Sequence, residues 1–135
     1  MTIKPDPKSI PRSWLKHYDP HVPETLEYPK QSLPELFRVS TEKHAQRTAV
    51  KFLGKSLSYA QIEKSANAFA AYLESKGIGK GDRVLLMLPN SPHFIIAYYA
   101  ILKRGAIVVP ASPLDTASEA EYKFRNSGAK IIIFL

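Results

Sequence analysis

Three short apolar runs, separated by two segments with helical patterning, constrain the fold of this chain more than any other feature. The runs are Arg83–Leu88, Ile107–Val109 and Ile131–Leu135. Strands that alternate with helices at this spacing predict a parallel sheet joined by right-handed crossovers. Apart from Arg83 at the start of the first run, the runs are continuously apolar, as buried parallel strands are. We therefore expect an α/β fold with parallel βαβαβ layers.

The segment between the first two runs has the start and stop signals of a helix. Ser91–Pro92 supplies a capping serine and a proline at the first helical position. Lys103–Gly105 supplies two bases and a glycine where the helix dipole and the C-terminal cap favour them. The residues between, Phe94–Leu102, are apolar nearly all round, so we expect this helix to be covered on more than one side.

The segment before the last run predicts a second helix with two possible starts. Thr116 with Glu119, or Ser118 with Glu121, has the spacing of a capping box. Gly128 follows the helical pattern and marks its end.

A hairpin is predicted upstream of the parallel layers. Thr48–Leu53 has the pattern of a strand, and Leu57 begins the strand that pairs back. Gly54–Lys55 is expected to be a two-residue type II′ turn with glycine first. A short helix is expected before it, with Ser32 and Glu35 as a capping box and an apolar face of Leu33, Leu36 and Phe37.

A longer helix follows the hairpin. Ser58 and Gln61 form a second capping box, and Gly77 supplies the positive φ of a C-terminal cap. One apolar face recurs at spacings of three and four residues; its members are Tyr59, Ile62, Ala66, Phe69, Ala70 and Leu73.

The chain divides by composition into an arm, residues 1–31, and a domain portion, residues 32–135. The arm has prolines at positions 5, 7, 11, 20, 23 and 29, and each proline disfavours helix for the residue before it. Trp14, Leu15 and Tyr18 are apolar anchors within the arm. We expect an extended segment that lies across the body of the protein.

Composition excludes several classes of protein. The 135 residues are 44% hydrophobic, which is enough for a core, and contain no cysteine, so disulfides, thiolate zinc sites and a cysteine nucleophile are excluded. The longest apolar run, Phe94–Leu102, is far shorter than the ~20 residues that span a bilayer. No secretory signal is recognised at the N-terminus. We expect a cytoplasmic protein without a transmembrane segment.

The net charge of +7 comes from 19 Lys and Arg residues against 12 Asp and Glu residues. A basic chain can bind nucleic acid, but these bases never form a run of five or six like charges. We therefore expect an ordinary basic surface and no nucleic-acid partner.

Candidate catalytic or metal-binding patterns are few. Gly77–Asp82 resembles a phosphate loop, but its glycines follow a helix and lead into a strand, which is typical of a turn. Asp82 and Arg83 are expected to pair with each other or to cap this turn. His17 and His21 have the spacing of helical metal ligands, but Pro20 interrupts the helix and no third ligand is evident. Neither a Gly-x-Ser-x-Gly elbow nor a Gly-x-x-x-x-Gly-Lys-Ser/Thr loop occurs. We expect no catalytic residue and no metal ligand.

Several motifs in register resemble the AMP-forming acyl-CoA synthetases and their adenylating relatives. Leu57–Ile62 resembles the first core motif of that family, and Gly77–Val84 its helix-to-strand link. Leu88–Pro92 follows in the family's order, and Leu102–Pro110 matches the second core motif. Ser127–Lys130, before the last strand, completes the resemblance.

The resemblance covers roughly Leu33 to Leu135 and implies the N-terminal portion of an AMP-binding domain, a scaffold segment. The family converts a carboxylic acid, such as a fatty acid, to an acyl-adenylate with ATP and Mg²⁺, and then transfers the acyl group to a thiol, usually that of coenzyme A. The family's Ser/Thr/Gly-rich loop ending in Lys, its aromatic-Thr-Glu motif, its ribose-binding Asp and its C-terminal Lys are not found in this sequence. We therefore expect no tight binding of these cofactors by this segment alone.

One candidate binding site follows from the resemblance. The loop after the second core motif lies near the path of coenzyme A in the family, which assigns Ala111, Ser112, Pro113 and Leu114 as cofactor-binding. The family position before this proline is often Asn, whereas here it is Ser112. A proline-stiffened crossover loop without a ligand is the alternative interpretation.

Two hypotheses for the whole chain stay open. Ile131–Leu135 is an apolar strand without a polar exit, so the domain is expected to be incomplete at its C-terminus. The first hypothesis is a scaffold segment of an acyl-CoA ligase, inert alone, whose partner is the rest of the domain. The alternative is a stand-alone module of the same fold that forms a homo-oligomer or complements a partner through its exposed last strand.

Overall fold

A computed structural model of the chain describes residues 11–135, which form two units: an arm that ends at Lys30 and a body, Gln31–Leu135. The arm contains a short 3₁₀ helix, η2 (Ser13–His17), in which no residue is buried. Its local hydrogen bonds run from the Tyr18 N–H to the Leu15 carbonyl and from the Val22 N–H to the Asp19 carbonyl. The sequence indicated an extended arm but missed η2, and docking of the arm on the body stays a prediction.

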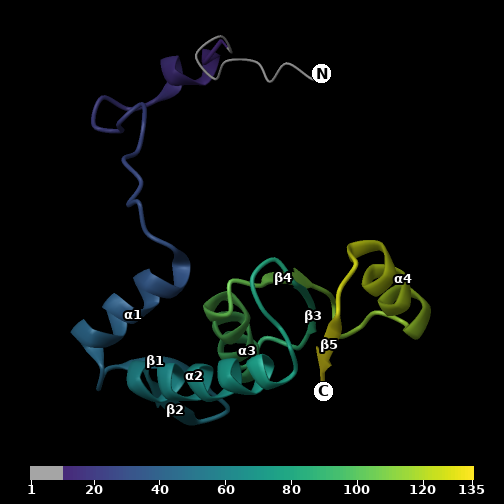
Figure 1. Ribbon diagram of the computed structural model, residues 1–135. Coiled ribbons are helices and arrows are strands. Elements are labelled where there is room, and N and C mark those ends of the chain that lie inside the picture. Colours follow the sequence, from purple (N-terminus) through teal and green to yellow (C-terminus); the bar gives the residue numbers. More distant parts are fainter. Residues whose placement is uncertain (1–10) are drawn as a thin grey trace. The chain divides into compact units, whose positions relative to one another are not determined.

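The body has four α-helices and five β-strands (Figure 1). In chain order these are α1 (Leu33–His44), β1 (Thr48–Phe52), β2 (Lys55–Ser58), α2 (Tyr59–Ser75), β3 (Arg83–Met87), α3 (Pro92–Lys103), β4 (Ile107–Pro110), α4 (Ala117–Ser127) and β5 (Ile131–Phe134). The predicted α/β class is confirmed. No helix within residues 11–135 combines the length and apolarity that a membrane span requires.

The parallel sheet has the strand order β4-β3-β5, with β3 in the centre. Val84 and Leu86 on β3 belong to the core that α2 and α3 share with the sheet. Leu85 is also fully buried, and because strand residues alternate it faces the other side. Figure 1 shows α4 on that side of the sheet, opposite α3. The central strand is thus covered on both faces, which explains its continuous apolar run.

Helix α3 is covered as its apolar sequence predicts. Every residue from Phe94 to Leu102 is buried or half-buried. Ala97, Ala100 and Ile101 lie in the core with α2, and the Phe37 ring of α1 stacks on Tyr99 with a centroid distance of 4.1 Å. Contacts from α1, α2 and the sheet therefore replace the solvent that an amphipathic helix would face.

The hairpin turn differs from its prediction. Phe52 pairs with Lys55, so the central turn residues are Leu53 and Gly54, with φ of 46° and 76°. Two positive φ angles are typical of a type I′ turn, whose twist matches that of the flanking strands. The predicted type II′ turn at Gly54–Lys55 is wrong because the strand register moves the turn back by one residue.

The predicted capping boxes are confirmed at α2 and α4 and wrong at α1, and at α3 the predicted positions of Ser91 and Pro92 are confirmed without a capping bond. Ser58 caps α2 with Gln61, and Thr116, rather than Ser118, caps α4 with Glu119. Ser32 and Ser91 occupy the N-cap positions of α1 and α3, but neither side chain makes a capping hydrogen bond. A proline lies in the first turn of both uncapped helices.

The Gly77–Asp82 segment is a turn between α2 and β3, as expected. The Asp82 carboxylate accepts the Gly79 N–H at 2.9 Å and pairs with Lys130 at 2.6 Å. The hydrogen bond from Lys130 is the main reason why the pKa of Asp82 is lowered. Asp82 therefore caps the turn as predicted, but its ionic partner is Lys130 and not Arg83.

Candidate functional site

Two neighbouring strands of the sheet send their connections to opposite faces. The chain leaves β3 through Leu88–Ser91 into α3, and it leaves β4 through Ala111–Thr116 into α4. Because α3 and α4 lie on opposite faces (Figure 1), the two connections diverge at the carboxyl ends of the strands. Ligands of open α/β sheets bind at such a divergence. This edge is therefore the candidate functional site.

The Ala111–Thr116 loop is held in shape by its own hydrogen bonds. The Ala111 N–H donates to the Leu86 carbonyl at 2.9 Å, which joins the loop to β3. The Ser112 N–H donates to the Asp115 carboxylate, and the Leu114 N–H donates to the Ser112 hydroxyl, both at 3.2 Å. The loop is therefore closed by hydrogen bonds within the chain, which is compatible with both the ligand-path and the stiffened-crossover interpretation.

Lys123 and Glu119 on α4 complete this closure. Lys123 donates to the Asp115 carboxylate at 2.5 Å. Glu119 accepts the Thr116 N–H at 2.8 Å, and this hydrogen bond is the main cause of the lowered pKa of Glu119. Both carboxylates near the loop are thus occupied by structural contacts, which leaves neither of them for acid–base chemistry.

The four predicted cofactor-binding residues lie together in this loop. Ala111 is half-buried, whereas Ser112, Pro113 and Leu114 are exposed, and Leu114 is 90% exposed. Their side chains offer one hydroxyl and apolar surface. Such a loop can form one wall of a ligand path, and coenzyme A binding by these residues stays a prediction.

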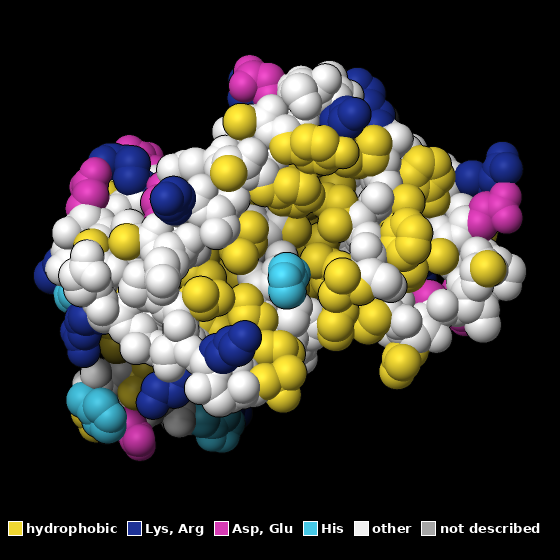
Figure 2. Space-filling model, turned by 90° about the horizontal axis from the view of Figure 1, so that it is seen from below, with side chains coloured by type: hydrophobic (Ala, Val, Ile, Leu, Met, Phe, Trp, Pro, Cys, Tyr) yellow, Lys and Arg dark blue, Asp and Glu magenta, His cyan; other side chains and the backbone are white. Residues whose placement is uncertain are grey.

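Apolar side chains gather at the same edge of the body. Besides Leu114, the large exposed apolar residues here are Phe134, 62% exposed, and Leu135, 81% exposed. Figure 2 shows a broad apolar area on the face seen from below, the side to which the C-terminal end of β5 points in Figure 1. Exposed apolar surface of this kind marks a site of contact with a ligand or with further protein.

The described residues do not fit a Mg²⁺ or ATP-phosphate site. Residues 11–135 contain no group of three His, Cys, Asp or Glu side chains that could hold a metal ion. His17 ends η2 and His21 lies in a turn beyond it. The Gly77–Asp82 turn precedes β3, so it lies at the amino end of the sheet, away from the ligand edge.

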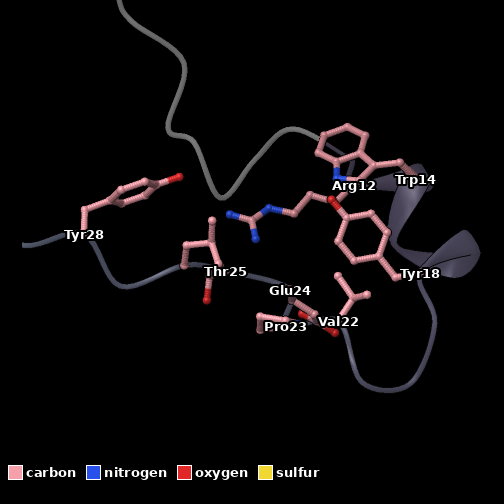
Figure 3. Close-up of a pocket in the computed structure, with 9 residues that line it drawn as sticks. Arg12, Trp14, Tyr18, Val22, Pro23, Glu24, Thr25 and Tyr28 are labelled. Carbon is pink, nitrogen blue, oxygen red and sulfur yellow. The ribbon is translucent and has the colours of Figure 1, made fainter. Parts of the chain in front are cut away.

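The arm has a surface hollow of its own. It is lined by Arg12, Trp14, Tyr18, Val22, Pro23, Glu24, Thr25, Leu26 and Tyr28. Figure 3 shows the Trp14 and Tyr18 rings next to each other, with the Arg12 guanidinium pointing into the space between them and Tyr28. Most of these side chains are exposed, so the hollow is an open surface and not an enclosed site.

Sequence reasoning missed two features of the sheet edge. The Asp115–Lys123 pair joins residues eight positions apart, a spacing that corresponds to no local motif. Ser91 was predicted as a capping residue, but its hydroxyl is buried without a partner within the described chain. Neither feature has a signal in the sequence, because both depend on how α3 and α4 sit against other elements.

The sequence matches a family model described as AMP-binding enzyme over residues 37–134. It is 39% identical over 124 residues to a long-chain-fatty-acid–CoA ligase of Bacillus subtilis (strain 168), covering 92% of this chain and 22% of the relative. A long-chain-fatty-acid–CoA ligase of Salmonella typhimurium is also 39% identical, with 90% and 22% covered. The chain thus spans about a fifth of the length of these curated relatives.

Two solved structures are similar in fold. The N-terminal subdomain of Klebsiella oxytoca NpsA, in complex with 3-hydroxyanthranilyl-AMSN, superposes with a TM-score of 0.72 at 25% identity. That match covers 76% of this chain and 26% of the other. The N-terminal domain of FACL13 from Mycobacterium tuberculosis, an inhibitor-bound crystal structure, has a TM-score of 0.69 at 31% identity, with 75% and 26% covered.

Proposed function

The chain belongs to the family of AMP-binding enzymes, and from this premise we propose that it is the N-terminal scaffold segment of an AMP-forming acyl-CoA ligase. The observation that carries the proposal is the match over residues 37–134 to the family, together with the likeness to N-terminal portions of solved relatives. A long-chain fatty acid is the proposed substrate, because the relatives at 39% identity are named for it. A cytoplasmic setting belongs to the same proposal.

The proposed role of residues 11–135 is structural. They offer no metal-ligand cluster, and the carboxylates near the loop are held by Ser112, Lys123 and Thr116. In this proposal the nucleotide, Mg²⁺ and the reacting carboxylate are held by the rest of the domain. The apolar edge around Leu114 and Phe134 is the surface that the rest of the domain covers.

A chimera tests this role. The corresponding N-terminal segment of the Bacillus subtilis ligase is replaced by this chain, and fatty-acid-dependent exchange of pyrophosphate into ATP is measured. We expect exchange by the chimera and none by residues 1–135 alone. Exchange by the isolated chain would contradict the scaffold role. A folded chimera without exchange, judged by circular dichroism and a cooperative melt, would contradict the family function.

The Ala111–Leu114 loop is proposed as a wall of the coenzyme A path. Leu114 is 90% exposed, so Leu114→Asp in the active chimera should raise the KM for coenzyme A several-fold and leave pyrophosphate exchange unchanged. Tyr122→Asp on α4, at a position 68% exposed, is the matched control. Equal KM values for coenzyme A in the two variants would show that the loop is not part of the coenzyme A path.

The alternative, a stand-alone dimerisation module, is favoured by one observation. Strand β5 is an outer strand that pairs only with β3 within the described residues, and Phe134 near its end is exposed. Unpaired strand edges are templates for pairing with another chain. Size-exclusion chromatography with light scattering discriminates the two: a stable dimer of the isolated chain supports the module, whereas a monomer or an aggregating chain supports the scaffold segment.

A further inference from the structure

The tip of the β1–β2 hairpin carries an exposed leucine in an unfavourable backbone conformation. Leu53 has a φ of 46° and is the only residue other than glycine with a positive φ within residues 11–135. Its side chain is 87% exposed. The first central position of a type I′ turn favours Asn, Asp or Gly, which adopt positive φ at low cost and expose no large apolar side chain. A residue that departs from both local preferences indicates a role beyond folding.

The neighbours of Leu53 make the tip apolar with basic flanks. Phe52, which precedes it, is 38% exposed, and Lys51 and Lys55 enclose this apolar pair in the sequence. Lys55 pairs with Phe52 across the hairpin, whereas Lys51 pairs with Ser56. Because successive residues of a strand point to opposite faces, the two lysines leave the hairpin on opposite faces. Each face of the apolar tip therefore carries one positive charge.

The surrounding segment is rich in basic residues without acidic partners. Residues 43–64 contain five Lys or Arg residues: Lys43, Arg47, Lys51, Lys55 and Lys64. All five are exposed, and none takes part in an ion pair within residues 11–135. The one acidic residue of the segment, Glu63, pairs with Lys103 of α3 at 2.6 Å. The positive charge of this segment is thus uncompensated in the described part of the chain.

The base of the hairpin is fixed to the start of α2. The Tyr59 N–H donates to the Arg47 carbonyl at 3.1 Å, and the Ala60 N–H donates to the Ala45 carbonyl at 3.0 Å. Both strands contact α2, and Figure 1 shows the hairpin beside this helix and away from the parallel sheet. A fixed base holds the apolar tip and its lysines in one arrangement, which lowers the entropy cost of binding.

An apolar tip with basic flanks matches the surface of a membrane that contains anionic lipid. Clustered Lys and Arg residues are attracted by anionic headgroups. Apolar side chains beside them become buried at the boundary between headgroups and acyl chains. Phosphate contacts of a nucleic acid would need only the basic residues, so the exposed Leu53 and Phe52 favour lipid.

We propose that the β1–β2 hairpin binds an anionic membrane surface, with Leu53 and Phe52 inserted below the headgroups and Lys51 and Lys55 at the lipid phosphates. The contact is peripheral and needs no membrane-spanning segment. The proposal does not depend on the ligase function, because the hairpin is separate from the Ala111–Leu114 loop.

The test is co-sedimentation of the 135-residue chain with lipid vesicles. One set of vesicles contains phosphatidylcholine and phosphatidylglycerol, and the other contains phosphatidylcholine alone. We expect saturable binding to the anionic set and at least tenfold weaker binding to the neutral set, because several lysines contribute. Raising the salt from about 0.1 M to about 1 M shortens the Debye length from ~10 Å to ~3 Å and should weaken the binding.

Leu53→Asn separates lipid binding from a structural role. It should weaken binding to anionic vesicles by about tenfold, because a leucine is no longer buried in the bilayer. The melting temperature should stay the same or rise, because Asn suits the positive φ of this turn. Leu114→Asn, at a position 90% exposed in another loop, is the matched control and should leave vesicle binding unchanged.

A pair of double variants tests the charges. Lys51→Gln with Lys55→Gln should weaken binding to anionic vesicles by about twentyfold, as the attraction of two lysines to an anionic surface predicts. Lys76→Gln with Lys80→Gln removes two exposed lysines outside the segment and should weaken it far less. Circular dichroism and a cooperative melt confirm that each variant is folded.

Four results would overturn the proposal. Equal binding to anionic and neutral vesicles, or to neither, means no anionic-lipid site. Equal losses in the two double variants mean attraction by overall charge. A loss in Leu114→Asn as large as that in Leu53→Asn means binding through the apolar edge around Leu114 and Phe134. Binding of duplex DNA that depends on Lys51 and Lys55, without vesicle binding, means a nucleic-acid site.

Discussion

The two crossover units of the sheet, β3–α3 and β4–α4, have similar helix start and stop signals in the sequence. Their helices are stabilised by different interactions. Both helices start at a hydroxyl residue and end at a glycine with a φ of 67°. Helix α3 is apolar and enclosed, but its N-cap side chain makes no bond. Helix α4 buries only Ala120, and its first turn has a complete capping box and the Asp115–Lys123 pair.

The difference shows that a helix can be held in either of two ways. Tertiary packing stabilises α3, so that a missing cap is tolerated and leaves Ser91 unpaired. Local hydrogen bonds stabilise α4, which lies on the opposite face with less apolar contact. Most helical stability in proteins comes from packing of an apolar face, so substitutions in the core of α3 should matter most.

The largest expected effect is at the core of α3. Ile101 is fully buried, so Ile101→Ala should lower the free energy of unfolding by ~2–5 kcal/mol through lost burial and a cavity. Tyr122→Ala, at an exposed position of α4, should change it by less than about 0.5 kcal/mol. Urea unfolding followed by circular dichroism measures both changes. Similar losses of unfolding free energy in the two variants would contradict the proposed difference between α3 and α4.

The C-terminal glycines should differ next. Valine at either position meets the cost of a β-branched side chain at positive φ, so Gly105→Val and Gly128→Val should each cost over ~1 kcal/mol. A Cβ at Gly105 would lie 3.4 Å from the Lys80 Cβ, whereas at Gly128 the nearest atom is the Arg83 guanidinium at 3.9 Å. Gly105→Val should therefore lower the melting temperature more than Gly128→Val does. The reverse order would show that the packing around Lys80 adjusts at little energetic cost.

The N-caps provide a sharper test of the same contrast. Thr116→Ala removes a complete capping box and should cost about 1 kcal/mol. Ser91→Ala removes a hydroxyl that has no partner, so stability should stay the same or rise. Paired urea denaturation curves decide; a loss at Ser91 as large as that at Thr116 would mean that the Ser91 hydroxyl is bonded in solution.

The smallest effect concerns pH. The pKa of Glu119 is lowered from its ordinary value of 4.5, chiefly because its carboxylate accepts the Thr116 N–H. A lowered folded-state pKa contributes stability that is present above pH 4.5 and is lost as the pH falls through the folded-state value. Glu119→Gln should therefore flatten the decline of melting temperature below pH 4.5, with Glu121→Gln as the control. An unchanged decline of the melting temperature would show that the Glu119 carboxylate does not contribute to the capping box.

The element order and most helix ends were predictable because their causes are local. The capping box of Ser58 with Gln61 and the glycine ends at Gly105 and Gly128 depend on residues three or four positions apart. The alternative starts of α4 were both local motifs, and only the structure selected Thr116. The predicted position of the hairpin turn was wrong by one residue. Strand register decides the position of the turn, and the sequence indicates this register only weakly.

The sequence by itself determined that this chain alternates strands and helices, and that its motifs match an adenylating family. The first property follows from the spacing of hydrophobic residues and from short-range hydrogen bonds, and the second follows from the resemblance of short motifs. Only the tertiary structure decided the strand order β4-β3-β5, the pairing of Asp82 with Lys130 and of Asp115 with Lys123, and the unpaired hydroxyl of Ser91. These features join residues whose separation along the chain has no fixed relation to their separation in space, so packing of whole elements had to place them.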